Sequence, residues 1–303
     1  MKTLSKLATK KSGLPILNTV LVQNNIAIAT DIDMEIRHET HLKDGLYCGI
    51  NFDKIQIPFT GKEKNFPLMR DFEGEVTSLE ISLESLEFVA QGMSKEETRY
   101  YPCGICFDKN CIITTDGHRR YKQDLPEYGL QKQILMPSIA VNYIISIMKE
   151  CKKKSGNLTI HQVGEFDGFT FTCGNYILKS KPIGGKFPDY TRVIPKDAPC
   201  VGYWNTTALK PIFAEISLIA KSLDYKRPNV AFEDNQVKIK YDKYEKSWDI
   251  EGLNFPQKTG FNLFYAKAVP SGSVYMKSAG DPMRVDCPCG TKQAVLMPLR
   301  LKE

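Results

Sequence analysis

The stretch CIITTDGHRRY, from Cys111 to Tyr121, follows the apolar run YYPCGICF at residues 100–107 and the polar turn Asp108-Lys109-Asn110. Two extended apolar runs joined by a short polar turn predict a β-hairpin. An amphipathic helix is predicted just before it, over residues 83–93. This unit of helix and hairpin is the pattern from which the rest of the chain can be interpreted.

The same unit recurs on both sides of this stretch. Upstream, a helix predicted over residues 4–11 precedes ILNTVLV, the turn Asn24-Asn25 and IAIATDIDMEI. Downstream, a helix predicted over residues 207–222 precedes PNVAF, the turn Asp234-Asn235 and QVKIKYD. Two shorter signals also repeat: Thr30-Asp31 with Thr115-Asp116, and Phe66-Pro67 with Phe187-Pro188. A recurring unit indicates a repeat architecture of class α+β.

The spacing of the turns indicates that the first unit is shortened. The first two turns are 109 − 24 = 85 residues apart and the last two 234 − 109 = 125, so about 40 residues are missing from the first unit. We therefore predict three domains, at residues 1–76, 77–198 and 199–303.

The composition limits which class of protein this chain can belong to. The 303 residues are 42% apolar and 25% charged, which is typical of a globular chain with room for two or three domains. No apolar run is long enough for a membrane span or a secretory signal, so we expect a cytoplasmic protein without a membrane partner. Nine cysteines are then expected to be reduced thiols. The net charge of 41 − 35 = +6 permits a polyanionic partner without requiring one.

Two predicted helices carry a stripe of lysines and short side chains. After Pro137, Ser138 is the predicted N-cap and an apolar stripe faces inward. The inward positions are Val141, Ile144, Ile145 and Met148, then Leu209, Ile212, Phe213 and Ile216 in the later helix. The outward positions are Asn142, Ser146, Lys149 and Lys153, then Lys210, Ala214, Ser217 and Lys221. Such a stripe is typical of a solvated face or of a surface for an anion, and the outward Glu84 and Glu87 in the helix at 83–93 argue against a uniformly basic face.

No motif indicates catalysis or a cofactor. The four histidines lie outside any nucleophile or metal-ligand motif, and glycine-rich phosphate loops are absent from the sequence. The nearest approach to zinc spacing is Cys103 with Cys106 and Cys111, and Cys287 with Cys289. Since Cys103 and Cys106 face opposite sides of an extended run, we expect buried thiols rather than a metal site. The prediction is a non-catalytic protein without cofactors.

Five segments, in order along nearly the whole chain, resemble signatures of the bacterial sliding clamp family, the beta subunit of DNA polymerase III. They are Leu14-Pro15-Ile16-Leu17 with Ala29-Thr30-Asp31, Arg99-Tyr100-Tyr101, Thr115-Asp116-Gly117-His118-Arg119, GKFPDYTRVIP at 185–195, and VLMPLRL at 295–301. The resemblance implies the DNA-clamp fold, a ring of domains that each hold two sheet-and-helix halves. The first domain would be reduced, because residues 49–66 leave no room for its second half.

The resemblance also implies a DNA sliding clamp, a processivity factor that tethers a DNA polymerase to double-stranded DNA. The polymerase and the clamp loader would insert linear apolar motifs in a pocket between the central and C-terminal domains. The pocket residues would be Thr115, Gly117, His118, Arg119, Pro188, Arg192, Val193, Tyr225, Asn262, Tyr265, Met297, Pro298, Leu299, Arg300 and Leu301. Residues near DNA would be Lys10, Lys11, Tyr100, Tyr101, Lys149, Lys153, Lys210 and Lys221.

Three departures qualify what the resemblance implies. Arg120 and Pro102 stand where the family usually has apolar residues, so the preferred motif would differ. A family subunit supplies six halves to a homo-oligomeric ring, whereas this chain is predicted to supply five, which makes ring closure doubtful. Two other hypotheses stay open: a non-encircling adaptor or decoy that binds clamp partners, and a cysteine- or metal-dependent enzyme, which stoichiometric zinc would favour.

Overall fold

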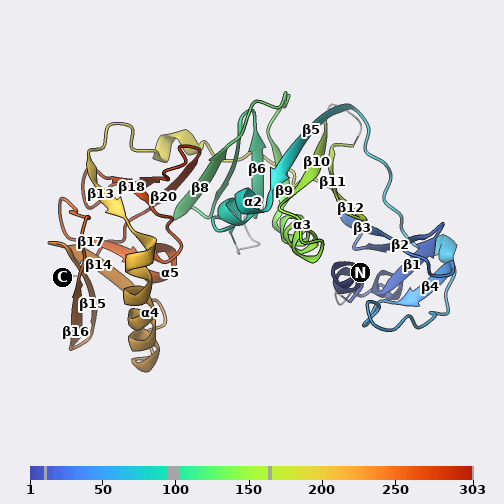
Figure 1. Cartoon of the computed structure of the whole chain (residues 1–303), viewed down its shortest axis with the longest axis horizontal. Helices are drawn as coiled ribbons and strands as arrows, with labels where there is room; N and C mark the ends of the chain where they lie inside the picture. The colour runs from blue at the N-terminus through green and yellow to red at the C-terminus, as the bar shows by residue number, and fades with distance from the viewer. Residues whose placement is uncertain (10–11, 95–102, 163–165, 302–303) are drawn as a thin grey trace. The chain divides into compact units, whose positions relative to one another are not determined.

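The computed structural model describes residues 1–9, 12–94, 103–162 and 166–301 and divides into two compact units (Figure 1). Unit 1 holds residues 1–112 and 126–187, and unit 2 holds residues 113–125 and 188–303. The predicted division into three domains stays a prediction. The predicted α+β class with repeated sheet-and-helix segments is confirmed.

Each unit contains repeats of the order β-α-β-β-β. In the described part of the chain this order occurs four times, as β5-α2-β6-β7-β8, β9-α3-β10-β11-β12, β13-α4-β14-β15-β16 and β17-α5-β18-β19-β20. A fifth, partial copy stands first, as α1-β1-β2-β3, and is followed by β4. The helices are α1 (Lys2–Ala8), α2 (Leu83–Ala90), α3 (Ser138–Glu150), α4 (Thr206–Ser222) and α5 (Leu263–Ala266), with short 3-10 turns η1 (Pro15–Asn18), η2 (Glu63–Asn65) and η3 (Tyr190–Val193).

Unit 1 is built on an antiparallel eight-stranded sheet of order β4-β1-β2-β3-β12-β11-β10-β5. Its strands are β4 (Gly45–Cys48), β1 (Thr19–Gln23), β2 (Ile26–Thr30), β3 (Met34–Glu39), β12 (Tyr176–Ser180), β11 (Gly168–Cys173), β10 (Ser155–Gln162) and β5 (Glu75–Ser82). The pair β6 (Gly104–Asp108) and β9 (Ile134–Pro137) also belongs to unit 1. Helix α3 packs against both α1 and α2.

Unit 2 contains two sets of strands. One has the order β13-β18-β19-β20-β8 and the other the order β16-β15-β14-β17. The strands are β13 (Cys200–Trp204), β18 (Gly272–Tyr275), β19 (Met283–Asp286), β20 (Lys292–Leu296), β8 (Arg119–Asp124), β16 (Tyr244–Asp249), β15 (Gln236–Tyr241), β14 (Asn229–Glu233) and β17 (Thr259–Asn262). Strand β7 (Cys111–Thr115) passes from unit 1 into unit 2.

The predicted hairpins form because their turn residues tolerate a left-handed backbone. Asn24 and Asn25 have φ of 53° and 62°, and Asp234 and Asn235 have 48° and 60°. Positive φ at both central residues is the geometry of a tight two-residue hairpin turn, which Asn and Asp adopt more readily than most residues. These turns place β1 against β2 and β14 against β15.

The predicted N-cap of α3 was wrong. The N-cap is Pro137, and Ser138 is the first helical residue without a capping side-chain bond. The fixed φ of proline already provides the extended cap conformation, and the Ser138 N–H donates to Cys103 O at 2.8 Å instead. Ile145 is also only half-buried, while Tyr143 and Ile147 are buried.

The first repeat is reduced, as expected. Between β4 and β5 the structure has a turn at residues 51–54, the turn η2 and an extended segment at 66–74, without a further helix and hairpin in that described stretch. Residues 57–59 instead pair with the outer side of β4, where Cys48 N donates to Ile57 O and Phe59 N donates to Leu46 O, each at 2.8 Å.

Each unit has its own core. Trp204 and Phe232 of unit 2 pack with ring centres 5.3 Å apart, and Phe232 lies 5.1 Å from Phe255. In unit 1, Leu4 of α1 and Ile144 of α3 are at most 1% exposed. Burial of such side chains is the main source of stability. In the described residues, no helix combines the length and apolar character needed to cross a membrane.

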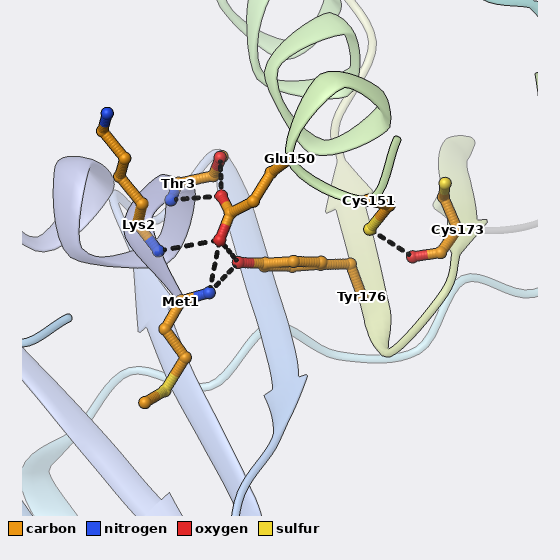
Figure 2. Close-up of polar contacts among 7 residues, drawn as sticks. All are labelled: Met1, Lys2, Thr3, Glu150, Cys151, Cys173 and Tyr176. Carbon is orange, nitrogen blue, oxygen red and sulfur yellow. Dashed lines mark hydrogen bonds and ion pairs between the residues drawn. The ribbon is translucent and has the colours of Figure 1, made fainter. Parts of the chain in front are cut away.

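Glu150, the last residue of α3, holds the start of α1 in place (Figure 2). Its carboxylate accepts hydrogen bonds from the main-chain N–H of Lys2 and of Thr3, both at 2.9 Å, and from the Tyr176 hydroxyl at 2.7 Å. The α-amino group of Met1 lies 2.5 Å away. Burial raises the pKa of Glu150, but the hydrogen bonds from Met1, Thr3 and Tyr176 outweigh it and hold the pKa at about 2.

We expect Glu150→Gln to lower the free energy of unfolding at neutral pH by about 1–2 kcal/mol, since a quarter-exposed ion pair is partly screened by solvent. A carboxyl with a depressed pKa stabilises the fold above its unfolded pKa of about 4.5, and this stabilisation is lost as the pH falls through about 2. Urea unfolding should therefore separate the two proteins at pH 7 and bring them together towards pH 2. Glu127→Gln, at an exposed position of unit 1, is the control and should change little. An equal difference at both pH values would contradict the assignment.

Candidate functional site: a pocket turn and the terminal segment of unit 2

All the predicted pocket residues lie in unit 2, where the turn at residues 115–119, which we call the pocket turn, is locked by its own side chains. The Thr115 hydroxyl donates to Arg119 O at 2.8 Å and accepts from Gly117 N at 3.1 Å. The Asp116 carboxylate accepts from the main-chain N–H of His118 and of Arg119, each at 3.0 Å. Gly117 has φ of 87°, a conformation that glycine adopts without strain.

Tyr265, on α5, packs on the side chains of the pocket turn. Its ring stacks against the His118 ring with centres 6.1 Å apart, and the Arg119 guanidinium lies 4.5 Å from its centre. Arg119 is also held by Asp116 at 2.9 Å. Asn262 caps α5 by accepting from Phe264 N at 2.9 Å. Stacked rings and a cation over a ring favour a fixed arrangement of the three side chains.

The terminal segment, residues 297–301, lies beside the pocket turn. Met297 N donates to His118 O and Leu299 N to Gly260 O, both at 2.8 Å. Leu301 packs so closely on Gly260 that an added Cβ would meet it at 2.4 Å. A cavity of about 600 Å³ opens here, lined by Lys258, Ala279, Gly280, Pro298, Leu299, Arg300 and Leu301. An apolar cavity of this size with a few polar groups suits a short ligand.

Arg120, the unusual residue of the pocket turn's strand, points into the protein. It is 1% exposed, donates to the side chain of Gln293 and lies 3.4 Å from Tyr190 O. Gln293 in turn donates to Asp286 at 2.9 Å. A buried guanidinium needs such acceptors, because an unpartnered charge is costly in the interior.

The other predicted pocket residues have contacts of their own. Tyr225 stacks on Tyr241 with ring centres 4.4 Å apart, and Pro188 is exposed ahead of η3. The main chain of Arg192 and Val193 forms the end of η3, and their side chains lie outside what the structure describes. The structure thus brings together the pocket turn, Tyr265 and the terminal segment.

The lysines predicted to face DNA, which lie on α3, just after α3 and on α4, are exposed. Lys149 forms an ion pair with Glu87 of α2 at 2.6 Å, so one of the acidic residues noted in the sequence pairs with one lysine of the stripe. Lys153, Lys210 and Lys221 are exposed. The predicted positions Lys10, Lys11, Tyr100 and Tyr101 lie outside the described residues.

The cysteines form no recognisable ligand set. Within residues 1–9, 12–94, 103–162 and 166–301, no three His, Cys, Asp or Glu side chains gather as they would around a metal ion. Cys106 is buried in β6, and burial raises its pKa, which makes the thiol less reactive. Cys287 and Cys289 lie in the turn between β19 and β20.

Three lining residues were missed from the sequence. Lys258, Ala279 and Gly280 reach the cavity beside the terminal segment from two loops that are distant in the sequence. Only the Gly280-Asp281-Pro282 run carries a local signal, that of a turn, and it says nothing about a pocket.

The comparisons with known proteins point to one family. No protein-family model matches the sequence. The beta sliding clamp of Haemophilus influenzae is 23% identical over an alignment of 358 positions, which covers 97% of this chain and 94% of that protein. The beta sliding clamp of Escherichia coli K12 is 24% identical over 265 residues, which cover 78% of this chain and 69% of that protein. At least 358 − 303 = 55 positions of the first alignment are gaps in this chain, in agreement with a reduced chain.

Solved structures agree in fold. The sliding clamp of Caulobacter crescentus matches with a TM-score of 0.77 at 19% identity, covering 99% of this chain and 96% of that one. The sliding clamp of Bartonella birtlesii, solved with griselimycin bound, matches with a TM-score of 0.79 at 21% identity and the same coverage. The chain is thus similar over most of its length to curated beta sliding clamps and shares the fold of solved sliding clamps.

Proposed function

We propose that the protein acts in the cytoplasm as a sliding clamp, a processivity factor that tethers a DNA polymerase to duplex DNA. The observation that carries this proposal is the contact between the pocket turn and the terminal segment, where Met297 N donates to His118 O and the His118 ring stacks on Tyr265. The terminal segment that joins the pocket turn lines a cavity with Pro298, Leu299 and Leu301, which suits a short apolar anchor from a polymerase or a clamp loader.

The proposed contact with DNA is electrostatic and independent of base sequence. Exposed lysines on α3 and α4 can contact phosphates without reading bases, as sliding requires. The Glu87 carboxylate forms an ion pair with Lys149. The α3 face therefore attracts DNA less strongly than its lysines would without this partner.

Two substitutions should shift DNA affinity in opposite directions. We expect Glu87→Gln to free Lys149 and to raise the affinity for a 30-base-pair duplex, whereas Lys210→Ala with Lys221→Ala lowers it. Each phosphate contact that is lost should reduce the slope of log K against log salt by about 0.9. Fluorescence anisotropy between 50 and 200 mM salt measures both, with Lys243→Ala as an exposed control outside the helices. Equal slopes in all four proteins would contradict the proposed DNA face.

A specific observation favours a second candidate, a non-encircling adaptor or decoy. The reduced first repeat and the Glu87–Lys149 ion pair both weaken the case for a closed basic ring. Primer extension on singly primed circular DNA separates the two, using a polymerase of the same host. A clamp lengthens the products of single binding events, whereas an adaptor or decoy leaves them unchanged or shortens them.

A further inference from the structure

A second cavity lies wholly within unit 1 and belongs to none of the sites described above. Its volume is about 620 Å³, and it opens between the turn at residues 30–34, which we call the groove turn, and the extended segment at 67–72. Three large apolar side chains on its wall are exposed: Ile32 at 42%, Leu68 at 46% and Phe166 at 41%. Exposed apolar side chains around one cavity are typical of an interaction site.

The groove turn repeats the hydrogen bonds of the pocket turn one for one. The Thr30 hydroxyl donates to Met34 O at 2.9 Å and accepts from Ile32 N at 3.0 Å. The Asp31 carboxylate accepts from the N–H of Asp33 at 3.2 Å and of Met34 at 2.8 Å. Each bond joins the same positions as in the pocket turn, so the Thr-Asp pairs of the sequence mark one local structure built twice.

The chain segments around the two turns correspond as well. Lys181 N, just after β12, donates to Asp33 O at 2.9 Å, as Met297 N after β20 donates to His118 O at 2.8 Å. A proline follows in both cases, Pro182 here and Pro298 there, and both line cavities. The groove of unit 1 is therefore the internal-repeat counterpart of the pocket proposed for unit 2.

Isoleucine at position 32 has a strained backbone conformation. It has φ of 82°, where the pocket turn has Gly117 at 87°. A β-branched residue is strained in this region, and such strain is characteristic of functional positions. The strained backbone holds the isoleucine side chain on the cavity wall, half-exposed, where it adds apolar surface without contributing to the core.

The charges on the rim indicate what kind of ligand fits. The carboxylates of Asp167 and Asp71 are paired with Lys132 and Lys179. The Arg70 guanidinium lies 6.0 Å from the centre of the Phe166 ring, directly beside the apolar wall. A cation next to an apolar surface complements an acidic residue next to an apolar anchor.

We propose that this groove binds a second short linear peptide, with an apolar anchor flanked by an acidic residue, so that one chain holds two partner peptides. The comparison of the two turns rests on the proposed function of the unit 2 pocket, while the cavity, its exposed apolar wall and its rim charges stand independently. The groove would let one chain bind two partners, or one partner at two points, with the gain in avidity that linked sites provide.

The test uses a fluorescein-labelled synthetic peptide with an Asp-Leu-Phe core, measured by native mass spectrometry for stoichiometry and by polarisation for affinity. We expect two peptides bound per full-length chain, and one in Leu68→Glu and in a chain truncated after Leu296. Val76→Glu, which alters an exposed apolar residue of β5 outside the groove, should still bind two. Ile32→Gly should raise the urea midpoint by relieving strain and weaken the unit 1 site about tenfold.

The possible outcomes separate the two sites. One peptide on the full-length chain and none after truncation would overturn the second groove and leave the proposed pocket standing. One peptide that survives truncation but is lost in Leu68→Glu would support the groove and overturn the pocket. Two peptides on both Leu68→Glu and Ile32→Gly, or none on any protein, would overturn the groove.

Discussion

Deletion of residues 297–301 is expected to abolish peptide binding at the unit 2 pocket while the fold survives. Strand β20 ends at Leu296, so the deletion leaves every described strand of unit 2 intact. It removes Pro298, Leu299 and Leu301 from the cavity wall, together with the bonds from Met297 N to His118 O and from Leu299 N to Gly260 O. Loss of these two bonds should cost about 2 kcal/mol of stability, whereas loss of a central apolar wall typically removes most of the binding energy.

The measurement is a titration of labelled peptide against the full-length and truncated proteins, with binding by the unit 1 groove suppressed by Leu68→Glu in both. Circular dichroism and urea unfolding of the same samples check that the truncated chain is folded. Lys153→Glu is the control, because it changes the charge of an exposed residue of unit 1 near the end of α3. Equal affinity before and after truncation would remove the terminal segment from the site.

At micromolar concentration the free protein is expected to sediment as a monomer with weak self-association. The helices and hairpins of the described chain form four complete β-α-β-β-β repeats and one partial copy, so two chains supply ten where the family resemblance implies twelve. Packed elements have fixed widths and do not stretch to cover a shortage of two repeats. The ring of the family should therefore not close in the same way.

We expect weak self-association because of the segment between β4 and β5, which stands where the family resemblance implies a second half of the first domain. Ile50, Ile55 and Ile57 are 62%, 59% and 53% exposed there. Exposed apolar residues on a sheet edge favour association, although Pro58 limits strand pairing because it has no N–H. Changing Ile55 and Ile57 to Asp should remove the concentration dependence of the sedimentation coefficient. A tight dimer that stays on closed circular DNA and leaves when the circle is cut would contradict this prediction.

The hairpins and the helix stripes could be predicted from the sequence because their signals are local. Asn24-Asn25 and Asp234-Asn235 adopt the turns that their side chains favour, whatever surrounds them. The apolar period of α4 likewise agrees with its buried Leu209, Phe213 and Ile216. The family resemblance rests on the same property, since short motifs retain their local conformation.

Side-chain partners from distant segments could not be predicted in this way. The pairing of Lys149 with Glu87 and the burial of Arg120 against Gln293 join residues far apart in the chain. Whether a charge is free for DNA or neutralised depends on which helix packs beside it, and no periodicity within one helix contains that information.

The sequence by itself therefore determined the repeated helix-and-hairpin unit, the shortening of the first copy and the two Thr-Asp turns. Only the tertiary structure decided that Lys258, Ala279 and Gly280 join the terminal segment around one cavity, and that Ile32 stands on the wall of another. The reason is physical: turns and helix faces follow from short-range sterics and hydrogen bonds, whereas a cavity exists only where distant segments pack and leave a space between them.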